Sequence, residues 1–180
     1  MKWLIASDLH GSAHYTRLLL DTFAREKADR LLLLGDILYH GPRNDLPCEY
    51  APKEVIALLS PLKDRILCVR GNCDTEVDQM VLPFPILADY AVLPVGDRLV
   101  YCTHGHIYHG AHLPPLTPGD ILLHGHTHVP LCERREDVTI LNPGSVSIPK
   151  ENSWHGCMTL EDGCFRWIDF DGVCHMEYQA

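Results

Sequence analysis

The sequence predicts an α/β fold in which two β-sheets share one core. Two patterns predict this class: apolar strands alternate with amphipathic helices up to about residue 85, and strand segments separated by tight turns follow. A chain of 180 residues with 46% hydrophobic residues suits one globular domain, which we place at residues 1–180. No repeat or linker divides the chain, so we expect each half to build one of the two sheets.

Three strands and two helices are expected in the first half. The apolar run Lys2–Ser7 predicts a buried strand, and Ser12 is placed to cap a helix that has apolar side chains on one face. Arg30–Leu34 and Arg65–Val69 predict two further strands, and Pro52 opens a helix between them. Strands that alternate with helices in this way form a parallel sheet with right-handed crossovers.

The strands of the second half are expected to pair mainly in antiparallel fashion. Tyr90–Val95 and Arg98–Cys102 flank Gly96-Asp97, a dipeptide typical of a two-residue hairpin turn. Near the end of the chain, Asp162-Gly163 and Asp171-Gly172 separate three further strand segments. Short strands joined by such turns are typical of an antiparallel sheet.

Charge and cysteine usage exclude several classes of protein. The chain has 15 basic and 24 acidic residues, and its net charge of −9 disfavours binding to an extended nucleic acid. No apolar run approaches the roughly 20 residues of a membrane span, and the first apolar stretch is too short for a signal peptide. None of the eight cysteines forms a C-x-x-C pair, which favours reduced thiols. We therefore expect a cytoplasmic protein with no membrane partner.

Metal-capable side chains follow five of the predicted strands, and several of them belong to the 12 histidines of the chain. Ligands of open α/β sheets bind beyond the carboxyl ends of the strands, so we expect these side chains to meet at one rim. Residues two apart in an extended segment point the same way, which lets Asp8 and His10 face one site together. The candidate ligands are Asp8, His10, Asp36, Asn72, His104, His126 and His128.

Seven nitrogen and oxygen ligands are too many for one tetrahedral ion, and they suit two divalent ions. A carboxylate such as that of Asp36 can bridge such a pair, which in phosphatases clamps the attacking and leaving oxygens of an in-line displacement. Two dications less two carboxylates leave a local charge of about +2, which attracts an anion. A single histidine at a strand end is more often structural, but seven aligned groups favour a metal centre for a phosphate substrate.

An ordered set of short motifs spans most of the chain: Asp8-Leu9-His10, Gly35-Asp36, Gly41-Pro42-Arg43-Asn44, Gly71-Asn72-Cys73-Asp74, Thr103-His104-Gly105-His106, Gly125-His126-Thr127-His128 and Asn142-Pro143-Gly144-Ser145. Together they resemble the calcineurin-like metallophosphoesterases and, more narrowly, the small bacterial YfcE-type phosphodiesterases. The resemblance implies a four-layer αββα sandwich, in which helices flank two mixed β-sheets. It also implies a centre of two metal ions, commonly manganese, with iron, zinc, nickel or cobalt as alternatives.

The same resemblance implies roles for individual residues. Asp36 and Asn72 are expected to act in catalysis as well as in metal binding, and a metal-bridging hydroxide would attack phosphorus. One ion would be held by Asp8, His10, Asp36 and His128, and the other by Asp36, Asn72, His104 and His126.

Several residues keep two interpretations. Cys73 stands where most of the wider superfamily has a histidine, and it is either a weak donor to the leaving group or a small packing residue. Arg43 is either a phosphate clamp or a solvated turn residue. Asp74 is expected to cap a helix that begins near Thr75, with acid–base chemistry as the alternative, and only the resemblance places Asn142–Ser145 near the substrate.

We expect a metal-dependent phosphodiesterase that hydrolyses small phosphodiesters and has no extended nucleic-acid partner. Phosphomonoesters are an alternative substrate class, and a non-catalytic scaffold that binds partner proteins is an alternative function of the same fold. The complete set of seven ligands favours the enzyme. The native metal, the physiological substrate and the formation of a homo-oligomer are left open.

Overall fold

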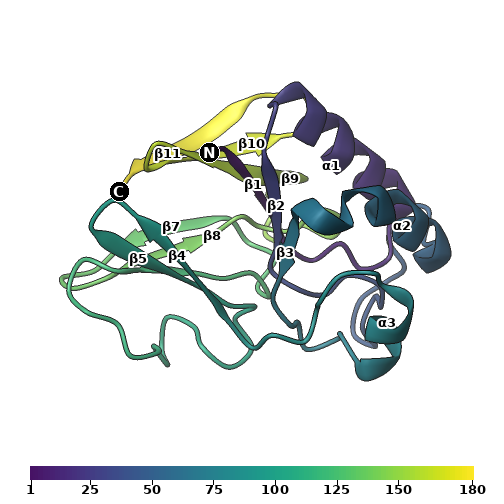
Figure 1. The fold of residues 1–180 in the computed structure, drawn as a ribbon, viewed down its shortest axis with the longest axis horizontal. Coiled ribbons are helices and arrows are strands. Elements are labelled where there is room, and N and C mark those ends of the chain that lie inside the picture. Colours follow the sequence, from purple (N-terminus) through teal and green to yellow (C-terminus); the bar gives the residue numbers. More distant parts are fainter.

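Two mixed β-sheets pack face to face in the computed structural model, which describes all residues from 1 to 180 (Figure 1). The elements are, in chain order, β1 (Trp3–Ala6), α1 (Ala13–Arg25), β2 (Arg30–Leu33), α2 (Pro52–Leu59), the 3₁₀ helix η1 (Ser60–Arg65), β3 (Ile66–Cys68), α3 (Glu76–Val81), β4 (Ala91–Val95), β5 (Arg98–Cys102), β6 (Ile121–Leu123), β7 (Leu131–Arg134), β8 (Thr139–Asn142), β9 (Gly156–Glu161), β10 (Cys164–Asp169) and β11 (Cys174–Gln179). The six-stranded sheet has the order β11-β10-β9-β1-β2-β3, and the five-stranded sheet has the order β4-β5-β6-β8-β7.

The first half of the chain follows the predicted pattern. β1, β2 and β3 pair in parallel, and α1 and α2 lie in the connections between them. The Ser12 hydroxyl accepts a hydrogen bond from the backbone N–H of Tyr15 and so caps α1, and Pro52 opens α2 as expected. The parallel arrangement brings the carboxyl ends of all three strands to the same edge of the sheet.

The expectation that each half of the chain builds its own sheet is wrong. The last three strands join the first sheet, because β9 pairs antiparallel with β1 (Figure 1). Leu4 and Ile5 of β1 point to opposite faces and both are fully buried. An unpaired edge on such a buried strand would leave backbone N–H and C=O groups without partners, and β9 pairs along the edge that β2 leaves free. The second sheet is built from residues 91–142, and it contains two parallel pairs, β5 with β6 and β6 with β8.

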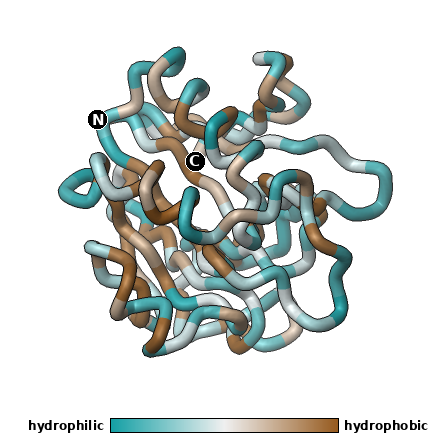
Figure 2. Tube along the Cα trace, turned by 90° about the vertical axis from the view of Figure 1, so that its right-hand side faces the viewer, coloured by the Kyte–Doolittle hydropathy of each residue, from teal (hydrophilic) through white to brown (hydrophobic).

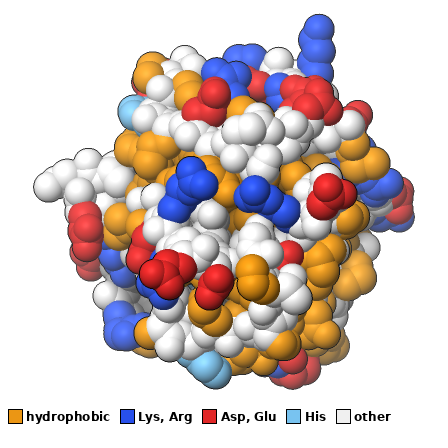
Figure 3. All heavy atoms as spheres, turned by 90° about the vertical axis from the view of Figure 1, so that its left-hand side faces the viewer, with side chains coloured by type: hydrophobic (Ala, Val, Ile, Leu, Met, Phe, Trp, Pro, Cys, Tyr) orange, Lys and Arg blue, Asp and Glu red, His pale blue; other side chains and the backbone are white.

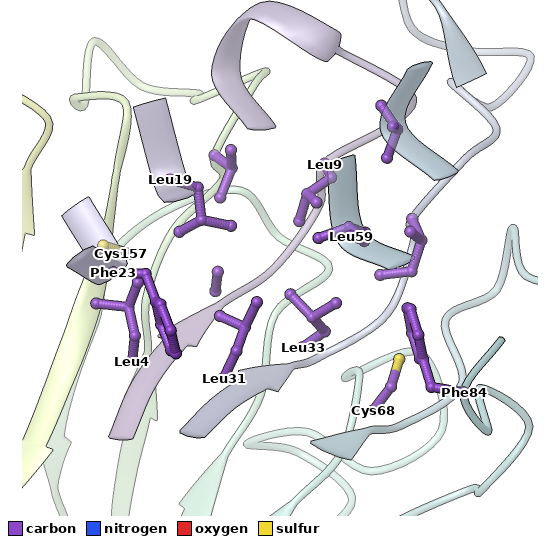
Figure 4. Close-up of a cluster of buried hydrophobic side chains, with 14 of the residues drawn as sticks. Leu4, Leu9, Leu19, Phe23, Leu31, Leu33, Leu59, Cys68, Phe84 and Cys157 are labelled. Atoms are coloured by element: carbon purple, nitrogen blue, oxygen red, sulfur yellow. The ribbon is translucent and has the colours of Figure 1, made fainter. Parts of the chain in front are cut away.

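Successive side chains along the strands of the first sheet point to opposite faces, and each face contributes to a separate hydrophobic core. Leu31 and Leu33 pack against the helices, where Leu19 and Phe23 of α1 meet them (Figure 4). Leu32 belongs to the second core, which also holds buried side chains of the other sheet. Figure 2 shows hydrophobic stretches running through the interior of the molecule and hydrophilic stretches in several of the peripheral loops.

The outer side of the five-stranded sheet is covered by a loop. All three α-helices end before residue 82, and residues 103–120 contain no helix. This loop packs on the sheet through Tyr108, whose ring centroid lies 6.1 Å from that of Tyr101, and through Gly110 next to Ile140. The sandwich of two mixed sheets is confirmed, and its layer on this side is irregular backbone.

Candidate metal centre

The metal-capable side chains lie where the carboxyl ends of parallel strands from both sheets meet. β1, β2 and β3 end beside one another, and so do β5 and β6. Hydrogen bonds join the two sheets at this point: the backbone N–H of His126 donates to Asp8 Oδ2 at 3.0 Å, and His104 Nδ1 donates to the carbonyl of Leu34 at 2.7 Å. The structure therefore brings all seven candidate ligands into one region.

Many of the candidate ligands sit on strained backbone. Residues other than glycine rarely adopt positive φ angles, which cost on the order of 1–3 kcal/mol each. Left-handed backbone turns the chain sharply just after a strand, so that the side chain points back toward the site. Five candidate ligands have such angles: Asp8 (59°), His10 (48°), Asp36 (56°), His126 (68°) and His128 (62°).

The first group of ligand atoms consists of Asp8, His10 and His128, all of which are buried. Asp8 Oδ1 lies 3.6 Å from His10 Nε2 and 3.3 Å from His128 Nε2. The two Nε2 atoms are 3.2 Å apart. One ion can therefore contact all three side chains.

The second group consists of Asp36, Asn72, His104 and His126. His104 Nε2 lies 3.5 Å from Asp36 Oδ2, 3.1 Å from Asn72 Oδ1 and 3.2 Å from His126 Nδ1. Asp36 Oδ2 is also 3.7 Å from His10 Nε2, in the first group. The carboxylate of Asp36 thus stands between the two groups.

The hydrogen bonds of three imidazoles show that cations fit this site. His10, His104 and His128 each donate Nδ1–H to a backbone carbonyl, so in the neutral ring each Nε2 presents a lone pair to the centre. Asp8 Oδ1 is buried and has no hydrogen-bond partner. Facing acceptors in a buried site require a cation, and nitrogen and oxygen donors suit manganese, iron, zinc, cobalt or nickel. The three carbonyls are those of Tyr39, Leu34 and Ile148, at 2.8, 2.7 and 2.7 Å.

The electrostatics of the centre also favour positive charge. Burial raises the pKa of Asp8, but the facing imidazoles of His10, His128 and His104 hold that pKa well below its usual range. Burial lowers the pKa of His104, yet the carboxylates of Asp36 and Asp8 raise it to about 9. The pKa of His126 is lowered to about 4 by burial and by the neighbouring His104. The carboxylates thus attract a cation to the centre, either as a proton or as a metal ion.

Two glycines allow the ligand loops to approach one another. A Cβ atom on Gly71 would collide with the backbone and carboxylate of Asp36. A Cβ atom on Gly125 would collide with the side chain of Ser7 and crowd Asp8. Both positions therefore require glycine for packing between the loops.

Asp74 holds the backbone of two ligand loops together, and the expectation that it caps a helix is wrong. Its carboxylate accepts hydrogen bonds from the N–H groups of Asp36 (2.8 Å), Ile37 (2.9 Å) and Gly71 (2.7 Å). The cap of α3 is Thr75, which forms a reciprocal capping box with Asp78. Sequence spacing alone could not distinguish a carboxylate that caps the helix from one that holds the loops, because Asp74 and Asp78 both lie within a few residues of the start of α3.

The segment Asn142–Ser145 supports the centre from behind and does not line the cavity. The hydroxyls of Ser145 and Ser147 both donate to the carbonyl of Asp8, at 2.9 and 3.0 Å. The Asn142 amide donates to the carbonyl of Gly125 at 2.8 Å. These bonds fix the two loops that carry Asp8, His126 and His128, and Ser147 is a supporting residue that the sequence did not indicate.

A cavity of about 410 Å³ opens over the centre. It is lined by five of the candidate ligands and by Cys73, while Asp8 and His104 lie outside its lining. Arg43 and Lys150 are exposed cations at its wall. Lys150 was not anticipated from the sequence; its backbone N–H donates to the carbonyl of His128 at 3.1 Å, which holds it beside a ligand. Two cations beside a polar cavity suit an anionic substrate.

Cys73 is a largely buried thiol that contacts two of the candidate ligands. Its backbone N–H donates to Asp36 Oδ1 at 2.8 Å, and its sulfur accepts a hydrogen bond from Asn72 Nδ2 at 3.3 Å. The second bond turns Asn72 Oδ1 toward the centre. Burial and the carboxylate of Asp36 raise the pKa of the Cys73 thiol. The residue thus orients both neighbours, and without bound metal it stays a neutral thiol.

The model of the calcineurin-like phosphoesterase superfamily domain matches residues 1–162. The chain belongs to this superfamily, and it is a hydrolase of phosphoric esters. Membership of a metallophosphoesterase family implies that the chain binds divalent metal.

Individual proteins similar to this chain include phosphodiesterases of the same superfamily. Phosphodiesterase YfcE of Escherichia coli K12 is 47% identical over 150 residues, which are 83% of this chain and 82% of the relative. The solved structure of YfcE, a phosphoesterase from E. coli, matches with a TM-score of 0.95 at 41% identity and covers 99% of this chain and 98% of its own. Phosphodiesterase MJ0936 of Methanocaldococcus jannaschii is 26% identical over 153 residues, 80% of this chain and 83% of the relative.

The same fold also occurs in Vps29 from Entamoeba histolytica. One of its structures matches with a TM-score of 0.62 at 21% identity, covering 99% of this chain and 100% of that chain. Separately, no helix of the structure combines the length and the apolar character that crossing a membrane requires.

Proposed function

We propose that the protein is a phosphodiesterase that hydrolyses small phosphodiesters at a centre of two divalent metal ions, with manganese as the favoured metal. The observation that carries this proposal is the position of Asp36 Oδ2, 3.7 Å from His10 Nε2 in one ligand group and 3.5 Å from His104 Nε2 in the other. A carboxylate in that position can bridge two ions. Similarity to phosphodiesterase YfcE supports the diester as substrate.

Two divalent ions, when bound, would lower the pKa of a water molecule and neutralise charge that develops on the phosphoryl oxygens. The chain supplies the remaining functions. Two hydrogen bonds fix Asp36 before substrate binds: the backbone N–H of Cys73 donates to its carboxylate, and its own backbone N–H donates to the carboxylate of Asp74. Arg43 and Lys150 at the cavity wall would hold the non-reacting phosphate oxygens.

Small substrates are favoured by the distribution of charge. The formal net charge is −9, and on the face shown in Figure 3 lysine and arginine side chains alternate with aspartate and glutamate. A single phosphate group can be held between Arg43 and Lys150, whereas a polynucleotide needs a longer row of cations. We also propose a cytoplasmic location, because all eight cysteines are free thiols.

A screen of phosphate esters tests this function. The purified protein, supplied with Mn²⁺, is assayed against diesters and monoesters that share nitrophenolate as leaving group. We expect cleavage of the diesters at least about tenfold faster in kcat/KM, a difference of about 1.4 kcal/mol. Elemental analysis before and after treatment with a chelator is expected to show two ions per chain. A preference for monoesters, or one ion per chain at full activity, would contradict the proposal.

A further inference from the structure

A second group of metal-capable side chains lies outside the centre described above. His14, Cys48 and Glu49 each offer one ligand atom, and these atoms all lie within 4.8 Å of one another. His14 Nδ1 is 3.6 Å from Glu49 Oε1. None of the three residues lines the cavity over the metal centre, and none belongs to the motifs that define the family. The group therefore lies outside the site of the proposed hydrolysis.

The backbone holds these three residues together independently of their side chains. His14 is the second residue of α1, and the residues just before it anchor the segment that carries Cys48 and Glu49. The Ser12 hydroxyl donates to the carbonyl of Cys48 at 2.6 Å, and Ala13 N–H donates to the carbonyl of Glu49 at 3.0 Å. The two segments are thus fixed side by side before any ligand binds, which lowers the entropy cost of binding.

The carboxylate of Glu49 is oriented by a neighbouring arginine. Arg17 pairs with Glu49 Oε2 and with Glu54, so Glu49 Oε1 remains directed to His14. Once the Cys48 thiol is deprotonated, it and the two glutamates carry three negative charges. The guanidinium of Arg17 offsets one of them, and a divalent ion balances the other two.

We propose that His14, Cys48 and Glu49 bind one zinc ion at the protein surface. Imidazole nitrogen, thiolate sulfur and carboxylate oxygen are ligands that zinc takes in proteins, and the thiolate selects against magnesium and manganese. Binding releases the thiol proton to water and leaves a fourth position for a water molecule. The ion joins α1 to the end of the segment 39–50, which also carries Arg43 at the wall of the catalytic cavity. Bound zinc would therefore restrain the loop of a proposed phosphate-binding residue.

Protection of the thiol from alkylation tests this site without using enzyme activity. Cys48 and Cys174 are the two exposed cysteines, so both can be followed by mass spectrometry in one sample of the protein with its resident metals. We expect Zn²⁺ to slow alkylation of Cys48 by iodoacetamide about tenfold or more, because a bound thiolate is a poorer nucleophile. The rate at Cys174 should stay unchanged, and Mg²⁺ should protect neither residue.

Variants decide whether the three residues act together. His14→Ala and Glu49→Gln should each abolish most of the protection of Cys48, while His112→Ala, at an exposed histidine on another loop, should leave it intact. Glu49→Gln keeps the shape of the side chain. It therefore still tests whether Glu49 is a zinc ligand if His14→Ala disturbs α1. Equal protection of Cys48 and Cys174, or full protection in both test variants, would overturn the zinc site and leave the proposed phosphodiesterase untouched.

Discussion

Asp36 is the side chain on which the proposed dinuclear centre depends most. Its Oδ1 is occupied by the backbone N–H of Cys73, and its Oδ2 is left to face both groups of ligands. One oxygen of this buried carboxylate thus fixes its orientation, and the other faces the site of the cations. Burial also strengthens the interaction between the negative charge and a cation.

Replacing Asp36 by asparagine should remove most of the activity and keep the fold. The amide can still accept the hydrogen bond from Cys73, but it cannot neutralise two cations. We expect kcat/KM for a nitrophenyl diester to fall about 100-fold or more, which corresponds to at least about 2.7 kcal/mol. Circular dichroism checks the fold, and Asp64→Asn on the exposed surface is the matched control. Full activity of a folded Asp36→Asn protein in excess metal would rule out the bridging role.

Cys73→Ser should have little effect on diesters with a good leaving group. Serine can accept the hydrogen bond from Asn72 and leaves the backbone N–H to Asp36 unchanged. For nitrophenyl diesters we expect kcat/KM within about threefold of the parent chain, whereas alkyl phosphates should be poor substrates of both proteins. If the serine variant loses the activated diesters while keeping its metal, Cys73 acts directly on the reaction.

At the scale of elements, the loops after β2 and β3 depend on one buried carboxylate. Asp74 accepts three backbone hydrogen bonds from these loops, and its side chain is almost fully buried. In the variant Asp74→Asn, an amide N–H₂ group would face backbone N–H donors. We expect a loss of roughly 1–3 kcal/mol in the free energy of unfolding, measured in urea, together with lower metal content. Asp78→Asn in the capping box of α3 should cost less and should keep the metal.

Asp120 links the starts of β5 and β6, and its carboxyl makes the stability of the fold depend on pH in the acidic range. Burial raises its pKa, but hydrogen bonds from the N–H of Leu99 and from Thr117 bring that pKa below its usual value. A carboxyl with a depressed pKa stabilises the fold above its unfolded pKa of about 3.9, and this contribution is lost as the pH falls through the folded pKa.

The variant Asp120→Asn tests this response. At pH 7 we expect it to lower the free energy of unfolding by roughly 1–3 kcal/mol. The difference from the parent chain should shrink as the pH falls below about 4, because the unfolded parent then takes up a proton that the folded parent takes up only at lower pH. A difference that stays constant between pH 7 and pH 3 would show that the charge of Asp120 contributes nothing.

Local sequence patterns predicted the elements better than their pairing. Pro52, the cap at Ser12 and the apolar runs located β1 to β3 and their helices, because these signals act within a few residues. The pairing of β9 with β1 joins Ile5 to Met158, and nothing in either segment encodes that partner. β7 and β8 were not identified, since their short segments lack a turn signal of the hairpin type.

At the scale of the whole molecule, charge limits the substrates. We expect that excess single-stranded or double-stranded DNA or RNA at moderate salt leaves cleavage of a small aryl phosphodiester almost unchanged in the presence of Mn²⁺. The acidic surface repels the polymer, and the two cations at the cavity can hold one phosphate. Strong inhibition by the polymer, or its rapid degradation, would reveal a nucleic-acid surface.

The sequence identified the ligand residues of the candidate site, but it did not predict how these residues are arranged in space. Strand ends and motifs indicated the seven ligands, because parallel strands deliver their ends to one edge. Asp74, Ser147 and Lys150 were assigned wrongly or missed, since each acts through contacts between segments distant in the sequence. The left-handed backbone at Asp8 and Asp36 is likewise imposed by the folded surroundings.

The antiparallel pairing of β9 with β1 also sets an order of events during synthesis. β1 is synthesised before β9, and its register with β9 places Trp3 opposite Leu160, far along the chain. The serines that hold the Asp8 carbonyl come equally late. The nascent chain must therefore lack the native partner for one edge of β1 until the residues of β9 have emerged. A product that stops before Ser145 would lack both β9 and the serines that hold the Asp8 carbonyl, so a metal centre held in this way reports that translation has passed these residues.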